Sequence, residues 1–329
     1  MKNIINLLTI LSVIVVSPTF ASELDSFQKR DQPIENSLPV INSLTDQFLD
    51  EAIYEANNPQ WDLRDFHEFL NSIGNAPCNE KKLYSVMRKY FRNHVQGKLT
   101  PEIINSPEIE KIETFIKNSI YQDFKWHESI MLGGVSKLFG DLAGHMVSVN
   151  GLLVGTDKFE HFLGTGFSYF NGLYLTKKNT VMDTLQKGFR LERGHLGART
   201  TGVFSYADLT ANFNGMRFWN HVLQYRDDVL GSEFNQGPYI TCQNDQWVKV
   251  KSIDWSNYID LAWDEAYNCS KFKTKGLVKK VKARLHEFSE RENKDLSCPL
   301  QLEEIEELTK KYKGLSPYLI NSTGHDVIN

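Results

Sequence analysis

Three segments between residues 155 and 219 each carry two polar side chains at a spacing that one face of a helix would align. The pairs are Asp157 with His161, Glu192 with His195, and Asp208 with Asn212. Residues three or four apart along a helix lie on the same face. Carboxylate and imidazole groups on facing helices can hold a metal ion, and Glu-x-x-His is a spacing of carboxylate-bridged dimetal sites. We therefore predict three helices whose polar faces converge on one pocket.

The chemistry expected of such a pocket depends on whether it holds a metal. A divalent cation such as zinc would lower the pKa of a bound water and make it a nucleophile near neutral pH. The predicted metal ligands are Asp157, His161, Glu192 and His195. Without a metal, a histidine could act as a base that a carboxylate orients. In either case the predicted catalytic residues are His161, Glu192 and Asp208.

Helix-end roles offer a second interpretation for some of these side chains. Asp157 would lie in the first turn of its helix, where the helix dipole favours a negative charge. Ser205 and Asp208 have the spacing of a capping box. His195 would lie in a last turn before Gly197, where a cation suits the dipole and glycine suits the cap. These roles require no site.

His161 and Glu192 have no comparable local role. Both are predicted at mid-helix positions with apolar neighbours, and buried polar groups need hydrogen-bond partners. We therefore expect these two residues to belong to a site. Ser168 and Ser205 lack the glycine pattern of a nucleophile elbow, so the sequence does not indicate a serine hydrolase.

Two motifs carry a resemblance to known families. They are GTDKFEHF at residues 155–162 and GVFSYADLTANFNG at residues 202–215. In these motifs the chain resembles a family of exported proteobacterial proteins and, more distantly, the VanZ-like and YfiM-like envelope proteins. The resemblance extends from the first motif to the second and no further.

The resemblance implies a shared helical core, an envelope setting and, in the VanZ-like case, a link to glycopeptide tolerance. Those families share a set of motif residues that follow one another in a fixed order along the chain. The matching positions here are Asp157, Lys158, His161, Glu192, Arg199, Asp208, Asn212 and Gly215. Among these, Lys158, Arg199 and Asn212 are the expected substrate-binding residues. The chain departs from VanZ-like proteins in two respects. Its helices between residues 157 and 230 carry too many polar residues to span lipid, and His195 stands where those proteins tend to have an amide.

The first residues have the form of a secretory signal peptide. Lys2 precedes the apolar run from Leu7 to Val16, and a small residue follows at Ala21, which predicts cleavage after that position. The apolar run is too short for a membrane anchor, which needs about 20 residues. We therefore expect a periplasmic or secreted protein with no transmembrane span after removal of residues 1–21.

Charge and cysteine content agree with export. Removing Lys2 from the 37 Lys and Arg residues leaves 36, against 41 Asp and Glu residues, with no basic block. Nucleic acid is therefore not an expected partner. The four cysteines are an even number at wide spacing, which indicates disulfides in an oxidising compartment. Three pairings are open, and we favour Cys242 with Cys269 and Cys78 with Cys298.

Hydrophobic periodicity predicts a mainly α fold, a soluble multi-helix bundle with a small β-hairpin near 239–250. The expected helices lie near residues 44–53, 63–70, 83–91, 107–124, 157–175, 180–194, 205–230, 255–268, 277–290 and 300–312. The glycine-rich stretch at 126–155 is expected to make close helix contacts or a re-entrant turn. We expect one helical domain at 43–315, with its motif core at 126–230 and its hairpin and C-terminal helices at 237–315. A flexible leader at 22–42 and a frayed tail at 316–329 would flank it.

These patterns lead to one main hypothesis and two alternatives. The main hypothesis is an exported envelope protein whose Asp/His/Glu pocket binds or hydrolyses an envelope component, either peptidoglycan or lipid, with a divalent metal such as zinc as candidate cofactor. The second is a non-catalytic structural or interaction protein of the envelope, in which the same residues form a polar network. The third is a lipid-binding protein that uses the apolar stretch from Met131 to Val154.

Overall fold

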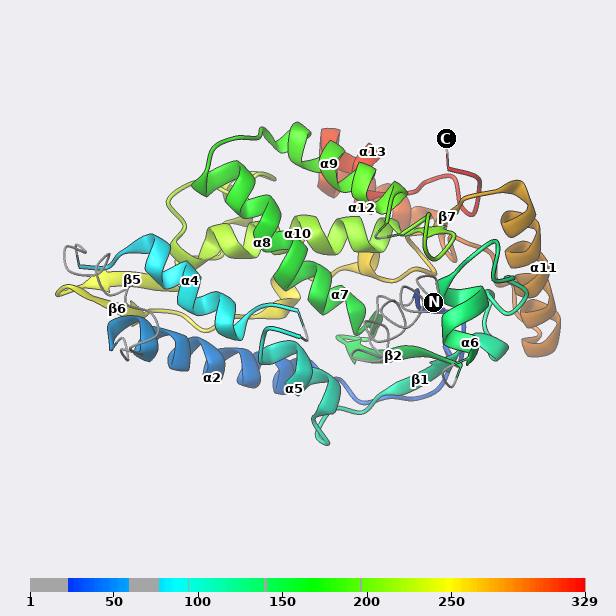
Figure 1. Ribbon diagram of the computed structural model, residues 1–329, viewed down its shortest axis with the longest axis horizontal. Coiled ribbons are helices and arrows are strands. Elements are labelled where there is room, and N and C mark those ends of the chain that lie inside the picture. The colour runs from blue at the N-terminus through cyan, green and yellow to red at the C-terminus, as the bar shows by residue number, and fades with distance from the viewer. Residues whose placement is uncertain (1–22, 59–76, 94, 139–140, 196, 329) are drawn as a thin grey trace, which may run out of the picture.

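The computed structural model describes residues 23–58, 77–93, 95–138, 141–195 and 197–328 (Figure 1). The predicted signal peptide at 1–21 and the predicted helix near 63–70 lie outside the described residues. Helix α10 (Tyr206–Leu223) runs through the middle of the molecule, and all of its residues are buried. The site is therefore built against α10.

Residues 157–162 of the first motif begin one continuous helix that has four parts. These are α7 (Asp157–Glu160), η4 (His161–Thr165), α8 (Gly166–Phe170) and η5 (Asn171–Leu175), of which η4 and η5 are wider π-type turns. This helix crosses α10 (Figure 1) at two glycines. A Cβ atom on Gly166 would lie 2.6 Å from Gly215 Cα, and one on Gly215 would lie 1.9 Å from Phe162 O. Glycine at both positions thus lets the two backbones approach closely enough for their polar side chains to meet.

Helix α9 (Val181–Arg193) is the third element of the predicted pocket. A capping box between Thr180 and Asp183 fixes its first turn. The helix contacts α10, and Gly188 lies so close to Tyr169 that a Cβ atom would be 1.6 Å from the tyrosine hydroxyl oxygen. The last turn of α9 carries the buried Glu192. The three predicted helices therefore converge.

Further helices precede and follow this centre. They are α2 (Leu38–Asn57), α4 (Glu80–Tyr90), α5 (Leu99–Asn105), α11 (Lys275–Glu292), α12 (Leu302–Tyr312) and α13 (Ser316–Leu319). The predicted hairpin forms as β5 (Ile240–Gln243) and β6 (Gln246–Lys249). Asn57 at the end of α2 makes two hydrogen bonds of 2.8 Å to the backbone of Trp247 in β6. The predictions of a mainly helical chain and of a hairpin near 239–250 are confirmed.

A bundle of helices alone is not what the chain forms. An antiparallel sheet has the order β1 (Ile112–Phe115), β2 (Leu142–Val149) and β3 (Leu152–Gly155), and β4 (Val203–Phe204) pairs with β7 (Lys271–Phe272). The predicted helix at 107–124 is therefore wrong. Successive residues along β1 alternate between buried and more exposed positions, which is the period of a strand. In the glycine-rich stretch, η3 (Met131–Val135) and α6 (Ser136–Leu138) precede β2.

The predicted helix at 255–268 is also wrong. Two single turns take its place, η7 (Trp255–Asn257) and η8 (Leu261–Trp263). The side chains of Asp254 and Asp260 accept hydrogen bonds from backbone N–H groups two residues further on. Aspartate favours such local bonds over a continuous helix. The helix predicted at 205–230 ends earlier, at Leu223, because Gln224 adopts a left-handed conformation.

The described part of the predicted leader differs from a flexible segment. Leu24 and Phe27 are buried, and the Asp25 carboxylate accepts a 2.8 Å hydrogen bond from the Ile120 backbone N–H. Helix α2 begins at Leu38, inside the predicted leader. Leu24 and Phe27 lie three residues apart within this mostly polar segment, and they anchor it in the core.

The predicted frayed tail differs in the same way. Asn321 is 2% exposed, and its side-chain amide donates to the carbonyl groups of Cys269 and Gly324. His325 is also buried, and it packs edge-on against Phe272. The C-terminal residues therefore cover part of the core.

The disulfide pairing that we favoured is wrong, although all four cysteines are bonded. Cys78 pairs with Cys242, and Cys269 pairs with Cys298. The first bond joins the segment before α4 to strand β5, because helices α2 and α4 pack together and α2 contacts the hairpin. The second bond joins the segment after η8 to the loop after α11. Spacing along the chain carried none of this information.

This pairing predicts the outcome of peptide mapping. Digestion of the non-reduced protein should release one peptide pair that contains Cys78 and Cys242 and another that contains Cys269 and Cys298. The double variant Cys269→Ser, Cys298→Ser opens a loop with a sequence separation of 29 residues. We expect it to unfold with a free energy lower by about 3 to 4 kcal/mol. A peptide that links Cys242 to Cys269 would contradict this fold.

Candidate functional site

The centre of the site is the ammonium group of Lys158, which is buried among three carboxylates. Its Nζ lies 2.7 Å from one oxygen of each: Asp157 Oδ2, Asp208 Oδ1 and Glu265 Oε1. Burial alone lowers the pKa of Lys158, but Asp157 and Asp208 outweigh this effect and hold that pKa well above its ordinary value. The ammonium is therefore charged.

His161 joins the same group through Asp208. Its Nε2 lies 3.1 Å from Asp208 Oδ2, and its Nδ1 lies 3.1 Å from Asn212 Oδ1. Burial alone lowers the pKa of His161, but the charge of Asp208 outweighs this and raises it to about 9. For Asp208, burial acts to raise the pKa, but His161 and Lys158 hold it well below its ordinary value. At neutral pH the two side chains are therefore imidazolium and carboxylate.

Three further carboxyl groups surround this pair. Burial raises the pKa of Glu192 to about 8, and the charge of Asp208 adds to the shift. Burial raises the pKa of Glu265 to about 7, against the lowering effect of Lys158. Burial also raises the pKa of Glu23 well above its ordinary value. The carboxyl groups outnumber the cations in this buried cluster, and bound protons offset the difference.

Ser205 holds several of these groups in place at the start of α10. Its hydroxyl oxygen accepts from the Asp208 backbone N–H at 3.1 Å and donates to Glu265 Oε1 at 3.1 Å. Its own backbone N–H donates to Glu192 Oε1 at 3.1 Å. Glu192 also needs the glycine at position 197, where a Cβ atom would lie 2.1 Å from Glu192 Oε1. Ser205 therefore caps α10, whereas the Asp208 carboxylate contacts Lys158 and His161 instead of serving only as the second half of the predicted capping box.

Three carboxylate oxygens in the cluster have neither a hydrogen-bond partner nor an ion-pair partner among the described residues. They are Glu23 Oε2, Asp157 Oδ1 and Glu265 Oε2, whereas Asp208 Oδ1 lies 2.7 Å from the Lys158 ammonium. An unpartnered buried acceptor costs about 1 to 3 kcal/mol. Such atoms in a folded protein commonly mark a bound ion, a water or a functional role.

Two sets of side chains in the cluster have the geometry of metal ligands. One set is Asp157, His161 and Asp208, and the other is Glu23, Glu192 and Asp208. Within each set, one ligand atom per residue lies within 4.8 Å of the others. Ligands around a metal with bonds of about 2.0 to 2.2 Å lie somewhat closer together, so a small inward movement would complete either set. Cys269, Cys298 and His325 also lie close together, but both cysteine sulfurs are bonded in a disulfide.

The structure brings most of the predicted site residues together and leaves two outside. Those in the cluster are Asp157, Lys158, His161, Glu192, Asp208 and Asn212. His195 and Arg199 are exposed. Helix α9 ends at Arg193, so the three-residue spacing from Glu192 to His195 no longer defines a helix face. The predicted metal ligand His195 and the predicted substrate-binding residue Arg199 therefore do not belong to the buried cluster.

Sequence reasoning missed Glu23 and Glu265. Glu23 lies in the predicted flexible leader, and its Oε1 accepts a 2.9 Å hydrogen bond from the Thr201 hydroxyl. Glu265 lies in the segment 255–268, which we predicted to be a helix. Neither residue lies within helical spacing of the two motifs, so no local pattern could have linked it to them.

A second polar network lies further along α10 and has its own charge balance. Asp228 accepts two hydrogen bonds from Arg217 Nε, at 2.8 and 3.0 Å, and lies 2.9 Å from His221 Nε2. His221 Nδ1 lies 2.8 Å from the Tyr258 hydroxyl, which in turn lies 2.8 Å from that of Tyr239. One carboxylate faces one guanidinium here, and burial lowers the pKa of His221. This network therefore has no excess of carboxylates and serves to position α10.

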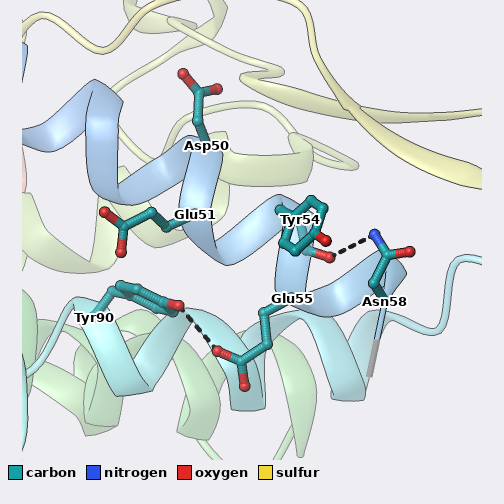
Figure 2. Close-up of a pocket in the computed structure, with 6 residues that line it drawn as sticks. All are labelled: Asp50, Glu51, Tyr54, Glu55, Asn58 and Tyr90. Atoms are coloured by element: carbon teal, nitrogen blue, oxygen red, sulfur yellow. Dashed lines mark hydrogen bonds between the residues drawn. The ribbon is translucent and has the colours of Figure 1, made fainter. Parts of the chain in front are cut away.

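An open pocket of about 580 Å³ lies on a different part of the molecule (Figure 2). Its lining comes from α2 and α4, and the residues are Asp50, Glu51, Tyr54, Glu55, Asn58 and Tyr90. Its three carboxylates have partners already: Lys249 for Asp50, Lys98 for Glu51, and both Lys89 and Tyr90 for Glu55. Internal ion pairs thus neutralise this pocket, which makes it a weaker candidate than the buried cluster.

A scan against family models, a search of curated proteins and a search of solved structures each found no significant match to this chain. The resemblance to exported and VanZ-like proteins therefore stays a prediction. Within the described ranges, no helix combines the length and the apolar content that crossing a bilayer requires. The candidate site thus rests on its own geometry: a buried group of carboxylates that shares one histidine and one lysine.

Proposed function

We propose that the chain is an exported protein of the bacterial envelope that binds a divalent cation through Asp157, His161 and Asp208. The observation that carries this proposal is the unpartnered Asp157 Oδ1, which is buried in a ligand set that also contains an imidazole. A cation would provide the partner that this oxygen lacks. It would also neutralise part of the excess negative charge of the carboxylates. In the metal-free protein, bound protons offset that charge.

The environment of His161 supports a ligand role. Metal-bound histidines commonly donate their second ring N–H to an acceptor, which orients the ring. Asn212 Oδ1 accepts at Nδ1, so Nε2 is the nitrogen that faces Asp208. A cation between Nε2 and the Asp208 carboxylate would displace one proton from the imidazolium. Binding should therefore weaken as the pH falls below the pKa of His161.

Three protein ligands would leave at least one position for water, as catalytic metal sites do. A cation held this way would supply an activated water, and the reaction class that fits is hydrolysis of an envelope component, either peptidoglycan or lipid. Glu192, with its pKa of about 8, would exchange a proton near neutral pH. His161 and Asp208 then act as ligands, and Lys158 holds the carboxylates in place.

The disulfides support an extracytoplasmic setting. Bonds such as Cys78–Cys242 and Cys269–Cys298 persist in oxidising compartments and are rare in the cytosol. This agrees with the predicted signal peptide at 1–21. We therefore place the protein in the periplasm or outside the cell.

A non-catalytic structural role is the second candidate. The observation that favours it is the position of Lys158, whose ammonium contacts three carboxylates and supplies them with a positive charge from within the protein. In that case the cluster would be a polar network that specifies how α7, α9 and α10 pack. Such a protein would need no metal.

Metal analysis of the purified mature protein separates the two candidates. After chelator treatment and incubation with Zn²⁺, the wild-type protein should retain bound metal after dialysis, and the variant His161→Ala should lose the equivalent held by that residue. His286→Ala is the matched control, because His286 is largely exposed on α11. If wild type and both variants retain no metal, and only His161→Ala melts at a lower temperature, the cluster is structural.

A further inference from the structure

We infer that Glu23, Glu192 and Asp208 form a second cation site, so that the cluster holds two divalent cations that share Asp208. This inference rests on the proposed function, because Asp208 is also a ligand in the first set. One ligand atom from each of the three residues lies within 4.8 Å of the other two. All three residues are buried, with exposed fractions of 4%, 2% and 3%.

The unpartnered oxygen of Glu23 points to a ligand at this second set. Glu23 Oε1 accepts from the Thr201 hydroxyl, whereas Oε2 is buried without a hydrogen-bond partner among the described residues. Glu192 accepts from the Ser205 backbone. Lys158 forms its ion pairs with Asp157, Asp208 and Glu265, and within the described ranges neither Glu23 nor Glu192 forms an ion pair. A cation would therefore meet two carboxyl groups that form no direct ion pair within the described ranges.

The two sites differ in ligand chemistry. Three carboxylates provide only oxygen, which suits hard cations such as Mg²⁺ and Mn²⁺. The first set includes an imidazole, which suits zinc and also binds Mn²⁺. Paired cations about 3.5 to 4 Å apart are the arrangement that hydrolases use to stabilise both the attacking and the leaving oxygen. The class of substrate this favours is a phosphate ester or an amide of an envelope component.

The N-terminal segment completes this second site. Glu23 is held there because Leu24 and Phe27 pack in the core and Asp25 binds the backbone at Ile120. Gln28 adds two hydrogen bonds to the Phe115 backbone, of 2.9 and 3.1 Å. The ligand thus comes from a segment far along the chain from α9 and α10. The second site exists only when this segment is docked.

Titration of the chelator-treated mature protein with Mn²⁺ alone tests the inference. Calorimetry should give two equivalents per chain, and the electron paramagnetic resonance spectrum should show a spin-coupled pair. Glu23→Gln, which keeps the shape of the side chain, should bind one equivalent and lose the coupled signal. Glu192→Gln should behave in the same way. The control Glu108→Gln, at an exposed position before β1, should keep two equivalents.

The outcomes distinguish this site from the first. One equivalent that survives Glu23→Gln and Glu192→Gln but is lost in His161→Ala would overturn the second site and leave the proposed function standing. One equivalent that is lost in both glutamate variants but kept in His161→Ala would place a single cation at Glu23, Glu192 and Asp208, and it would overturn both the proposed function and the cation pair. No binding of Mn²⁺ by the wild-type protein would overturn the second site, and together with no retained Zn²⁺ in the metal analysis it would also overturn the proposed function. Thermal unfolding of each variant shows whether it folds, and a folded Glu23→Gln that still binds two equivalents refutes the inference.

Discussion

Replacing Lys158 with methionine should lower the free energy of unfolding of the metal-free protein by about 3 to 5 kcal/mol at neutral pH. The ammonium is 1% exposed and lies 2.7 Å from the carboxylates of Asp157, Asp208 and Glu265. Methionine has a similar length but no charge, so the variant leaves these carboxylates buried without their counter-charge. Urea denaturation followed by circular dichroism measures the loss. The loss should shrink as the pH falls towards 5, because the Glu265 carboxyl, whose pKa burial raises, then takes up a proton.

Lys125→Met is the matched control for this substitution. Lys125 is exposed, so its replacement should change the free energy of unfolding by less than about 0.5 kcal/mol. Saturating Mn²⁺ should restore part of the stability of Lys158→Met, because a bound cation supplies positive charge to the same carboxylates. A loss below about 1 kcal/mol would show that the buried carboxylates do not depend on the ammonium, and the charge balance argued for the site would be wrong.

The local signals in the sequence were enough to place the three helices of the site. The capping box at Thr180 and Asp183 defines the start of α9, and the cap at Ser205 defines the start of α10. Spacing then placed His161 and Asp208 on inward faces. Burial confirms these placements, because both helix segments pack against each other through glycines. The same reasoning failed at His195, because helix α9 ends at Arg193, before the spacing from Glu192 to His195 is complete.

The remaining features depend on contacts between distant parts of the chain. Glu265 reaches Lys158 across 107 positions, and no spacing rule connects them. The bond between Cys78 and Cys242 spans 164 positions. The apolar pattern around residues 112–115 is too short to distinguish a strand from a helix. These residues form a strand because they pair with β2. Long-range packing therefore decided what local periodicity could not.

The metal-free protein is expected to lose stability as the pH rises from about 6 to about 9. Burial raises the pKa of Glu192 to about 8 and that of Glu265 to about 7. Their stabilising contribution is fully present below the unfolded value of about 4.3 and is lost as the pH rises through these folded values. His161 acts in the same direction, since its pKa is raised to about 9 and its contribution is full only below about 6.5. Asp208 has a lowered pKa and acts oppositely, but only in acid, below its unfolded value.

Urea denaturation in the presence of a chelator, at pH values between about 6 and 9, measures this slope, which should approach about 1.4 kcal/mol per pH unit for each proton released. Glu192→Gln should flatten the profile near pH 8, because the amide has no proton to lose, whereas Glu108→Gln should leave it unchanged. Mn²⁺ should also flatten the wild-type profile, since a cation displaces the protons that hold the cluster together. Stability that stays level or rises across this range would contradict a cluster neutralised by protons. It would also remove the charge argument for a cation, because the carboxyl groups would then have found their counter-charge within the protein.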